Sequence, residues 1–513
     1  MRNSKIIQVK KIKSALISVF YKDGLEAIAK GLRAQNVTIY STGGTQKFLE
    51  SVGCDVVAVE SLTEYPSILG GRVKTLHPKV FGGILARRSD ENDLLQLEEF
   101  DIPTIDLVIV DLYPFEETVA STTSEAEIIE KIDIGGISLI RAAAKNFNDT
   151  CVLSSSGQYK EFIQLYEGQE GCISLAQRKT FAAKSFAISS NYDTAIYNYF
   201  NESEELDCFK VSHQQKQILR YGENPHQNAS FYGKLDAYFD KLTGKELSYN
   251  NLVDVDAAVN VIAEFEVPSF AIIKHTNTCG LASAENNTLA YDKALACDPI
   301  SAFGGILATN KPIEKALAEK IHLLFCEVVI APDFSDEAFA ILSQKKNRIL
   351  LKQKIFTKPS LQFKSLLNGV LVQDYDAQIE GEASFDLVTE RSITANESKD
   401  LLFAIKAVKH LKSNGIAIVA NEQLIGMGCG QTSRVDALRQ AIAKGRAFGF
   451  DFKASVMASD AFFPFPDCVE IAAEHGIICV AQPGGSIKDQ DSIEACDEHK
   501  ISMVLTGVRH FKH

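Results

Sequence analysis

The sequence lacks several features that would place it in a specialised class of protein. Its 11 cysteines include no Cys-x-x-Cys pair, are odd in number and are scattered from Cys54 to Cys496. A large chain with this pattern is expected to hold reduced thiols in a cytosolic compartment rather than a disulfide framework. No apolar run approaches the roughly 20 residues that span a bilayer, and the basic MRNSKIIQVKKIK is followed only by ALISVF, too short for the core of a signal peptide. We therefore expect a cytoplasmic protein without membrane contact.

Positive charge is also scarce. The chain has 53 Lys and Arg against 66 Asp and Glu, a formal net charge of −13. This field does not favour nucleic acid as a partner, although a local basic pocket for a small anion is compatible with it. The hydrophobic fraction of 46% and the charged fraction of 23% are typical of globular proteins. At 513 residues the chain has room for about two to four domains.

Common nucleotide and metal motifs are missing as well. The GMGCGQ run at 426–431 lacks the third glycine of the dinucleotide fingerprint, and the run at 70–75 lacks the glycine that precedes the lysine of a P-loop. Neither His-x-Glu nor Pro-Cys-x-x-Cys occurs, so the zinc-deaminase signature is absent. The sequence therefore predicts no metal site.

The first half of the chain alternates predicted strands with predicted helices. The strands are expected at 15–20, 37–42, 56–59 and 106–110. This alternation predicts a parallel sheet with helical crossovers, in which ligands bind at the carboxyl ends of the strands. A long helix is expected over 176–200, and the acidic NESEELD follows it. We place a domain boundary there, between 1–205 and 206–513.

The second half is also a mixture of strands and helices. Strands are predicted at 269–275, 327–332, 415–421 and 455–459. Two stretches resemble each other: AIIKHTNTCG and AIVANEQLIGMGCG each lead into a helix and then into an Asp followed by small residues and Phe. Chance similarity is the alternative. A true repeat would make this half two similar α/β lobes.

Several loops of the first half have compositions suited to anions. In Ser41-Thr42-Gly43-Gly44-Thr45, between a strand and a helix, backbone N–H groups can converge on a phosphate. A plain turn with an N-cap is the alternative. Ser18 and Lys22 end the preceding strand and would lie at the same edge of the sheet. The GGRVKTLHP loop at 70–78 adds two cations, a hydroxyl and an imidazole.

Two other polar stretches are candidates for a site. Asp133 and two glycines open a helix that carries Arg141 and Lys145 on one face, for which a solvated surface stripe is the alternative. Lys274-His275 ends a predicted strand, where an imidazole can accept a proton and an ammonium can stabilise negative charge. An incidental pair is the alternative.

Together these strings resemble a known family, the bifunctional purine enzymes that combine AICAR formyltransferase with IMP cyclohydrolase. The resemblance runs from about Ala15 to His513 through STGGT, GGRVKTLHP, DLYPF, IDIGGISLIRAAAKN, LRYGENPHQ, DPISAFGG, GQTSR and SDAFFPF. It implies the last two steps of de novo purine synthesis. A formyl group passes from 10-formyltetrahydrofolate to AICAR, and dehydrating ring closure of the product, FAICAR, then gives IMP.

For the N-terminal domain the resemblance implies a methylglyoxal-synthase-like fold and the cyclohydrolase activity. The residues it implies for nucleotide binding are Ser18, Lys22, Ser41, Thr42, Gly43, Gly44, Thr45, Arg72, Val73, Thr75, Asp111 and Ile134. Lys145 is implied for proton transfer, and the groups implied around the reacting atoms are Lys74, Tyr113 and Asp133. Ring closure is intramolecular, so orientation and proton handling should supply most of the acceleration.

For the C-terminal domain the resemblance implies a duplicated cytidine-deaminase-like α/β fold without zinc. His275 is implied as proton acceptor and Lys274 as the group that stabilises the oxyanion. The implied nucleotide contacts are Arg220, Tyr221, Gly304, Glu327, Asn414, Phe462 and Arg509, and the implied folate contacts are Arg434, Asp467, Ser486 and Ile487. The folate is a co-substrate, no tightly bound cofactor is expected, and a homodimer with transferase sites across the subunit interface is implied.

The chain departs from the family pattern at a few positions. Phe20 and Tyr21 replace a Ser and an Asp, which puts contacts from those positions in doubt. Asp111 stands where Asn is common, and Glu327 aligns with an Asp one methylene shorter. The alternative function is a nucleotide-sensing regulatory protein that uses only the N-terminal phosphate site. Retention of His275 argues against it, because a sensor needs no base. A third hypothesis keeps only one of the two activities.

Overall fold

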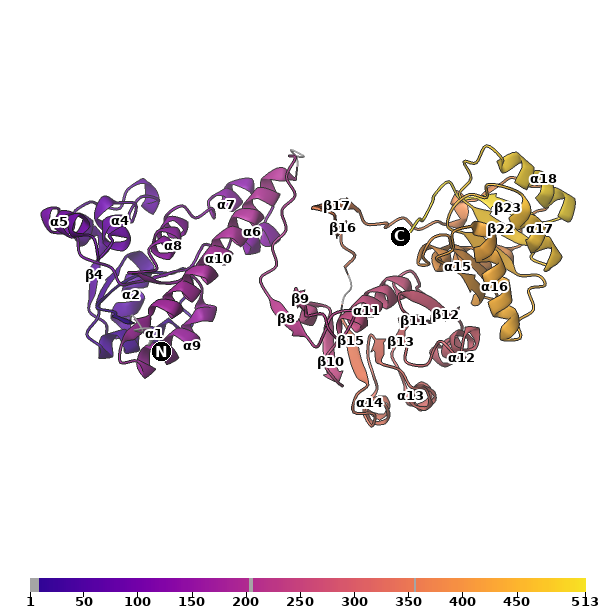
Figure 1. Ribbon diagram of the computed structural model, residues 1–513, viewed down its shortest axis with the longest axis horizontal. Coiled ribbons are helices and arrows are strands. Elements are labelled where there is room, and N and C mark those ends of the chain that lie inside the picture. The colour runs from indigo at the N-terminus through magenta and orange to yellow at the C-terminus, as the bar shows by residue number, and fades with distance from the viewer. Residues whose placement is uncertain (1–8, 203–205, 355–356) are drawn as a thin grey trace, which may run out of the picture. The chain divides into compact units, whose positions relative to one another are not determined.

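The computed structural model describes residues 9–202, 206–354 and 357–513. They form two compact units, unit 1 (Met1–Gln214) and unit 2 (Gln215–His513) (Figure 1). The boundary predicted after residue 205 adjoins residues 203–205, which lie outside the described residues. Within the described part of the chain, no helix is long and apolar enough to cross a membrane.

Unit 1 is built on a parallel sheet of five strands in the order β4-β3-β2-β5-β6. The sequence predicted a parallel sheet here, with four of these strands and no order. The strands are β2 (Ser14–Ser18), β3 (Thr38–Ser41), β4 (Val56–Ala58), β5 (Leu107–Val110) and β6 (Cys151–Leu153). The chain first winds outward from β2 through β3 and then returns to β5 on the other side of β2. A reversal of this kind opens a crevice at the carboxyl ends of the two central strands.

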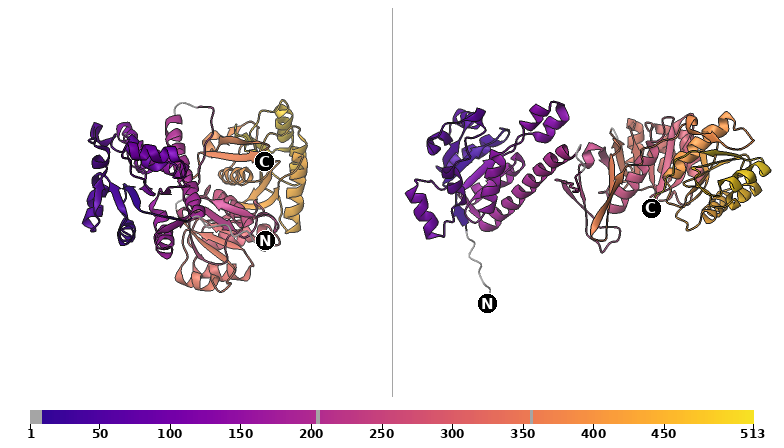
Figure 2. Two further views of the ribbon diagram at one scale, coloured as in Figure 1. Left: turned by 60° about the vertical axis from the view of Figure 1, so that its left-hand side comes forward. Right: turned by 90° about the horizontal axis from the view of Figure 1, so that it is seen from above.

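Helices cover both faces of this sheet (Figure 2). They are α1 (Leu25–Ala34), α2 (Gly43–Ser51), α3 (Val59–Thr63), α4 (Pro78–Leu85), α5 (Glu91–Glu99), α6 (Phe115–Ser121), α7 (Glu125–Ile129), α8 (Gly135–Lys145), α9 (Tyr159–Gly168) and α10 (Leu175–Asn201). Alternate residues of β2 point to opposite faces. Ala15 and Ile17 join the core with α1 and α9, whereas Leu16 joins the core with α4 and α8.

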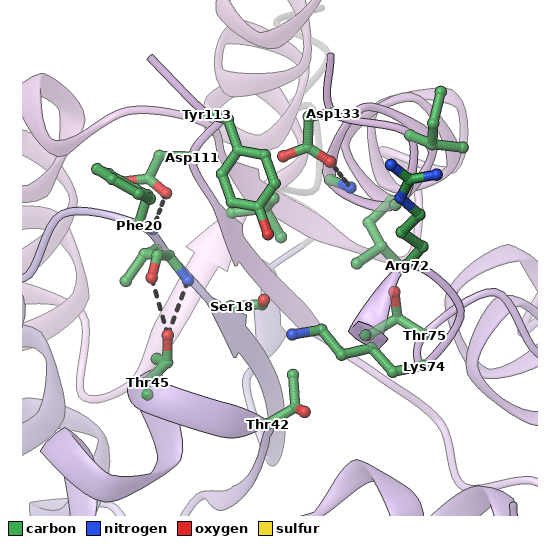
Figure 3. Close-up of a pocket in the computed structure, with 18 of the residues that line it drawn as sticks. Ser18, Phe20, Thr42, Thr45, Arg72, Lys74, Thr75, Asp111, Tyr113 and Asp133 are labelled. Carbon is green, nitrogen blue, oxygen red and sulfur yellow. Dashed lines mark hydrogen bonds between the residues drawn. The ribbon is translucent and has the colours of Figure 1, made fainter. Parts of the chain in front are cut away.

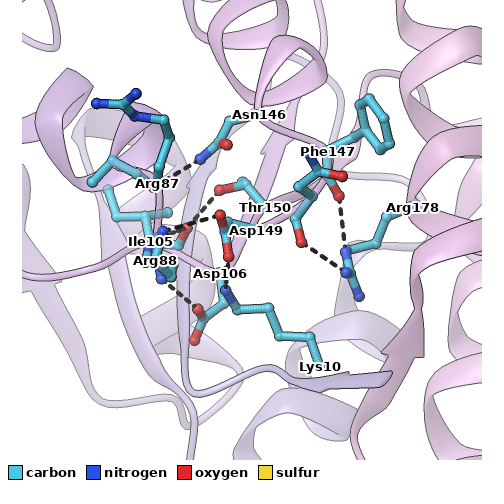
Figure 4. Close-up of polar contacts among 12 residues, drawn as sticks. Lys10, Arg87, Arg88, Ile105, Asp106, Asn146, Phe147, Asp149, Thr150 and Arg178 are labelled. Carbon is cyan, nitrogen blue, oxygen red and sulfur yellow. Dashed lines mark hydrogen bonds and ion pairs between the residues drawn. The ribbon is translucent and has the colours of Figure 1, made fainter. Parts of the chain in front are cut away.

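A polar cluster closes the amino-terminal edge of the same sheet (Figure 4). Arg88 is 3.1 Å from the Asp106 carboxylate, and Lys10 of β1 (Val9–Lys11) is 3.0 Å from Asp149. The buried Arg178 of α10 donates to three backbone carbonyls, among them that of Phe147 at 2.9 Å. Breaking a buried pair costs about 3–5 kcal/mol. Ion pairs and hydrogen bonds therefore hold this edge together, and a ligand can bind at the opposite, carboxyl edge of the strands.

Unit 2 contains a mixed sheet of 12 strands. In spatial order they are β10 (Phe239–Thr243), β15 (Ile349–Gln353), β14 (Val328–Ala331), β13 (Ile306–Thr309), β11 (Ser269–Lys274), β12 (Asn277–Ser283), β20 (Gln423–Gly428), β19 (Ile416–Ala420), β21 (Val456–Ser459), β22 (Cys479–Gln482), β23 (Ser502–Leu505) and β18 (Asp386–Leu387). Two separate hairpins are formed by β8 (Lys216–Leu219) with β9 (Ala229–Tyr232), and by β16 (Leu361–Leu366) with β17 (Gly369–Asp374).

The pairing within this sheet shows that the predicted repeat is real. In the first set, β11 pairs antiparallel with both β12 and β13, and β14 and β15 then add parallel to β13. In the second set, β19 pairs antiparallel with both β20 and β21, and β22 and β23 then add parallel to β21. Even the register shift recurs, between Ile272 and Ile273 and between Ile418 and Val419. We call the part with β10 to β15 lobe 1 and the part with β18 to β23 lobe 2.

The apolar core of unit 2 consists of three clusters, each formed where helices pack on the sheet. Lobe 1 has α11 (Tyr249–Ile262), α12 (Asn287–Cys297), α13 (Lys315–Leu323) and α14 (Asp336–Leu342), and lobe 2 has α15 (Ala395–Lys409), α16 (Arg434–Ala447), α17 (Asp467–Glu474) and α18 (Asp489–His499). On one face of the sheet, α11 and α15 contribute to a single apolar core that spans both lobes. On the other face, each lobe has a core of its own.

Candidate functional site

A cavity of about 560 Å³ lies at the carboxyl ends of β2 and β5 in unit 1, where the reversed strand order predicts a ligand (Figure 3). The predicted residues that line it are Ser18, Lys22, Thr42, Gly44, Thr45, Arg72, Lys74, Thr75, Asp111, Tyr113, Asp133 and Ile134. Segments more than 100 residues apart in the sequence supply them. The structure thus brings most of the residues predicted for the N-terminal domain into one place.

The end of β3 and the start of α2 are fixed to the end of β2. The Thr45 hydroxyl accepts from the Val19 N–H at 3.1 Å and lies 2.9 Å from the Val19 carbonyl. The buried Ser41 hydroxyl donates to the Ile17 carbonyl at 2.7 Å, so it holds β3 against β2 and does not line the cavity. Gly43 has a φ of 56°, in the left-handed region that favours glycine. Together these contacts set the start of α2, with its partial positive charge, at the cavity.

Asp111 joins β5 to the turn after β2. Its carboxylate accepts from the N–H groups of Phe20 and of Tyr21, the latter at 3.0 Å. A carboxylate offers two acceptor oxygens where an amide offers one, which explains an Asp in place of the family's Asn. Burial raises the pKa of Asp111, and the two N–H groups oppose that rise. Phe20 and Tyr21 therefore contribute backbone donors here, and the Phe20 ring packs edge-on against Tyr113.

Three cations line the cavity, Lys22 from the turn after β2 and both Arg72 and Lys74 from the loop at 70–78. Lys22 donates to the Phe20 carbonyl at 3.0 Å, and burial lowers its pKa. Lys74 reaches from its loop toward Ser18 and Thr42 (Figure 3). Arg72 lies at the rim and pairs with Glu130, and both side chains are exposed. This arrangement suits an anionic ligand such as a phosphate ester. Sequence reasoning missed Glu130, because no local pattern sets it apart from its acidic neighbours.

Asp133 is held at the beginning of α8. Its carboxylate accepts from the Gly136 N–H at 2.6 Å, and its own N–H donates to the Tyr192 hydroxyl at 2.9 Å. A side chain at Gly136 would place its Cβ 2.6 Å from the Asp133 carboxylate, so the glycine is required by this close approach. Burial raises the pKa of Asp133 and of Tyr113. A carboxyl group with a raised pKa at a ligand cavity is suited to proton transfer.

Four residues predicted for this site lie outside the cavity: Ser41, Gly43, Val73 and Lys145. Val73 forms a backbone bridge with Ile68. Lys145 is exposed in the last turn of α8. A helix rises 1.5 Å per residue, which puts Lys145 about 15 Å from Gly135 along the axis. The structure therefore does not bring Lys145 to the cavity of its own unit.

In unit 2, a cavity of about 750 Å³ lies in lobe 2. The predicted residues that line it are Asn414, Arg434, Phe462, Asp467 and Arg509. The buried Arg434 donates to the Ser459 hydroxyl at 2.7 Å and to the Asn414 amide oxygen at 2.8 Å, and it also pairs with Asp460. The Arg434 guanidinium is therefore fixed in position. Sequence reasoning missed other lining residues, including Ser433, Arg439, Phe465 and Phe511.

Lys274 and His275 lie at the tip of the β11–β12 hairpin in lobe 1. His275 and Thr276 have φ of 50° and 62°, and the Thr276 N–H donates to Asp254 at 2.7 Å. Left-handed backbone at non-glycine residues costs about 1–3 kcal/mol each and is concentrated at functional sites. The His275 imidazole is exposed. The Lys274 ammonium donates to the Phe303 carbonyl at 2.6 Å.

Gly304 lies against the same ammonium. It has a φ of 72°, in the left-handed region that favours glycine, and a Cβ there would lie 3.0 Å from the Lys274 Nζ. Glu327, the longer carboxylate, pairs with Lys245. These groups form a second cluster of predicted residues, and the structure places it in lobe 1 rather than at the lobe 2 cavity.

The remaining predicted residues join neither group. Arg220 stacks on the Tyr221 ring at 4.7 Å and donates to its hydroxyl at 2.8 Å. Ser486 donates its N–H to Asp489, and Ile487 is fully exposed. Among the described residues, no group of three or more His, Cys, Asp or Glu side chains is placed to hold a metal ion.

A family model described as "AICARFT/IMPCHase bienzyme" matches residues 143–444, and one described as "MGS-like domain" matches residues 24–138. The MGS-like match and the parallel sheet of unit 1 confirm the fold class predicted for the N-terminal domain.

Several curated relatives carry the name "Bifunctional purine biosynthesis protein PurH". The one from Bacteroides thetaiotaomicron is 57% identical over 504 residues, which cover 98% of this chain and 99% of the relative. Relatives from Acetivibrio thermocellus and Clostridium perfringens are 46% identical over 517 and 508 residues, in each case 98% of this chain and 100% of the relative.

Proposed function

Because the chain belongs to the AICARFT/IMPCHase bienzyme family, we propose that its two units divide the family's two reactions between them. The chain is a bifunctional enzyme of purine biosynthesis, with AICAR formyltransferase and IMP cyclohydrolase activities and 10-formyltetrahydrofolate as co-substrate. Unit 1 carries the cyclohydrolase and unit 2 the formyltransferase, with a boundary near residue 205. The matches over 98% of the chain favour this function over the nucleotide-sensing alternative.

The cavity of unit 1 is the observation that carries the assignment of ring closure. Lys22 and Arg72 bind the 5′-phosphate of the nucleotide, together with the start of α2, and Lys74 lies beside the reacting groups. The carboxamide nitrogen of FAICAR attacks its formyl carbon, and water leaves once a proton has reached the formyl oxygen. Asp133 and Tyr113 lie where they can give and take those protons. Cyclisation needs no second substrate, so holding the two groups together supplies much of the rate.

Lys145 is the residue that the family resemblance implies for proton transfer in ring closure. Its predicted role is proton transfer, yet it lies outside the cavity at the far end of α8. We expect Lys145→Ala to lower ring closure of supplied FAICAR by about 10²–10⁴-fold, the range for a lost acid–base group. FAICAR should then accumulate when the enzyme is given AICAR and 10-formyltetrahydrofolate. Unchanged IMP output would remove Lys145 from the mechanism.

Formyl transfer in unit 2 depends on Lys274 and His275. The AICAR amine is a poor nucleophile because its lone pair is delocalised toward the carboxamide. His275 takes the amine proton as the nitrogen attacks the formyl carbon, and the Lys274 ammonium stabilises the oxyanion of the tetrahedral intermediate. The bond from carbon to the folate nitrogen then breaks, and tetrahydrofolate leaves with a proton.

The two separate groups of predicted transferase residues favour a homodimer. We place the enzyme in the cytoplasm because its 11 scattered cysteines are expected to be reduced there. The lobe 2 cavity has Asn414 and Arg434 but, among the described residues that line it, no histidine. His275 lies exposed in lobe 1. A symmetric dimer lets lobe 1 of one copy complete the cavity of the other.

Mixing two inactive variants tests that arrangement. If the site is shared between copies, co-refolded His275→Ala and Arg434→Ala chains form mixed dimers with one intact site each. Formyl transfer should return to about a quarter of the native rate, because half the dimers are mixed and each has one of two sites. The same mixture of chains stays inactive if each site lies within one chain. Light scattering of the native enzyme gives the oligomeric state independently.

A further inference from the structure

The last residues of the chain form one wall of the lobe 2 cavity. Arg509 and Phe511 line the cavity, and the residue between them, His510, is turned away from it. The side chain of His510 is only 4% exposed. Its two ring nitrogens lie 2.7 Å from the Asp376 carboxylate and 2.6 Å from the Glu380 carboxylate. Sequence reasoning assigned no role to any of these three residues.

We propose that His510 is a positioning residue for formyl transfer, which holds Arg509 and Phe511 against the substrates by its clamp between Asp376 and Glu380. The proposal rests on the proposed function, because it takes the lobe 2 cavity as part of the transferase site. The clamp acts through its neighbours in the chain. The Arg509 guanidinium lies over the Phe511 ring, 4.5 Å from its centre, so these two side chains share one side of the segment. Fixing His510 on the other side therefore fixes both of its neighbours.

The clamp requires a charged imidazole. Only the imidazolium has two N–H donors, one for each carboxylate. Burial alone would lower the pKa of His510, but the hydrogen bonds to Asp376 and Glu380 outweigh it and raise the pKa to about 9. Glu380 is itself buried, with a side chain 3% exposed, so it would lie unpaired in the interior if the histidine were lost or neutral.

The acceptors of the clamp are held in place. The connection between the lobes runs through residues 375–380. Tyr375 donates to Asn260 of α11 at 2.5 Å, and Lys409 of α15 donates to the Gln378 carbonyl at 2.7 Å. Lys409 also lies 4.0 Å from Asp376 and 3.3 Å from the buried Glu264. Two lobes therefore fix the segment that holds His510.

Other contacts keep the C-terminal segment folded when the clamp is weakened. The His510 N–H donates to the carbonyl of Asp460, whose carboxylate pairs with Arg434. The backbone of Lys512 accepts from Ser413 at 2.9 Å and donates to its hydroxyl at 2.9 Å. Two charged groups contact the His510 ring, Asp376 and Glu380. The charged and titratable groups around them are Lys409, Glu264, His410, Asp460, Arg434, Lys512 and Asp256. Loss of His510 should therefore loosen the cavity wall without unfolding the lobe.

The test separates binding from turnover. We expect His510→Gln to raise the KM for AICAR about tenfold while kcat changes less than about threefold, since the residue touches neither substrate. Glu380→Gln should raise the KM in the same direction. In the native enzyme the KM should rise as the pH passes about 9 and the imidazolium loses its proton, and this rise should be missing in His510→Gln. The exposed His499, at the end of α18, gives the matched control His499→Gln, with an unchanged KM.

Two further measurements keep the outcome clear. Cyclisation of supplied FAICAR by the same protein reports folding of the other unit, and the melting temperature reports unit 2. If His510→Gln does not fold, Glu380→Gln decides. Arg434→Ala is the reference for the cavity. If Arg434→Ala impairs formyl transfer and neither clamp variant moves the KM, this proposal is overturned and the proposed function stands. If Arg434→Ala has no effect, the assignment of the cavity and the role of His510 both fail.

Discussion

The two lobes of unit 2 carry the same hairpin with different residues at its tip. In lobe 1 the turn residues are His275 and Thr276, and in lobe 2 they are Asn421 and Glu422, all four with φ between 50° and 62°. A carboxylate on the preceding helix accepts from the turn in both lobes. Asp254 accepts from the Thr276 N–H, and in lobe 2 Asp400 accepts from the N–H groups of Asn421 and Glu422 at 2.8 and 2.6 Å.

The fold supplies the left-handed turn in both lobes, and the side chain at the tip supplies the chemistry. The left-handed turn is a property of the duplicated architecture, because it is present in both copies. Asn is among the residues that tolerate this conformation best, and Asn421 is an ordinary choice for it. In lobe 1 the same exposed position carries an imidazole. The duplication therefore provides two equivalent frames, and the residue at the tip decides which of them can accept a proton.

Replacing each tip residue by alanine should give the largest difference between the lobes. We expect His275→Ala to lower formyl transfer by about 10²–10⁴-fold, the range for a lost general base, with cyclisation of supplied FAICAR intact. Asn421→Ala, at the equivalent position, should leave both activities within about twofold of native. Steady-state assays of tetrahydrofolate release and IMP formation measure both. Equal losses from the two variants would mean that the turn, and not the imidazole, matters.

Removing the carboxylate behind each turn should give a smaller effect, mainly on rate in lobe 1 and mainly on stability in lobe 2. Asp254→Ala frees the turn that carries His275, and we expect formyl transfer to fall about tenfold through misplacement of the base. Asp400→Ala removes two hydrogen bonds and should lower the free energy of unfolding by about 1–3 kcal/mol, with little change in activity. Denaturant titration and the formyl-transfer assay together distinguish the two cases. A purely structural role for Asp254 would show as lost stability without lost rate.

The helix caps should behave alike in the two lobes. Helix α11 begins with a capping box of Ser248 and Asn251, and α15 begins with one of Thr394 and Glu397. Replacing Ser248 or Thr394 by Ala should lower the free energy of unfolding by about 1 kcal/mol in each case. Neither change should affect catalysis, since the two cap side chains bond within their own helix ends and do not line the lobe 2 cavity. A difference of several kcal/mol between the lobes would contradict their structural equivalence.

Acid should weaken the cap of α15 and leave that of α11 unchanged, with a smaller effect on stability than loss of either cap. Burial tends to raise the pKa of Glu397, but Arg391 and the Thr394 N–H outweigh it and hold the pKa below the usual 4.5. The stabilisation is therefore present above pH 4.5 and is lost as the pH falls through the lowered value. Asn251, the equivalent residue of α11, does not titrate. Hydrogen exchange at acidic pH should show the first turn of α15 opening before that of α11.

Much of the architecture could be predicted from local pattern. The β-branched runs and the glycines after them gave the strands and crossovers of unit 1, and the recurrence of Asp before small residues and Phe pointed to the repeat. The loops at 41–45 and 70–78 were informative because several functional side chains stand close together in the sequence. Those loops account for much of the unit 1 cavity lining.

What could not be predicted depends on partners far away in the sequence. Asp254 is one carboxylate among many in a helix, and only the aligned lobes show that it matches Asp400. Glu130 is recognised by its contact with Arg72, which is 58 residues away. The surface position of Lys145 depends on the direction and length of α8, which a motif does not contain. Residue identity gives candidates, and the distances between elements decide which of them can meet.

The seam between the lobes has a consequence for how unit 2 responds to heat. Strands β12 and β20 meet in a single residue pair, Ala282 with Gln423, so the backbone contributes little there. The lobes are joined instead by interdigitated side chains such as Phe265 and Phe403, whose ring centres lie 5.2 Å apart. Because both lobes share this apolar core, neither can unfold without exposing the core of the other. Calorimetry should therefore record a single unfolding transition for both lobes.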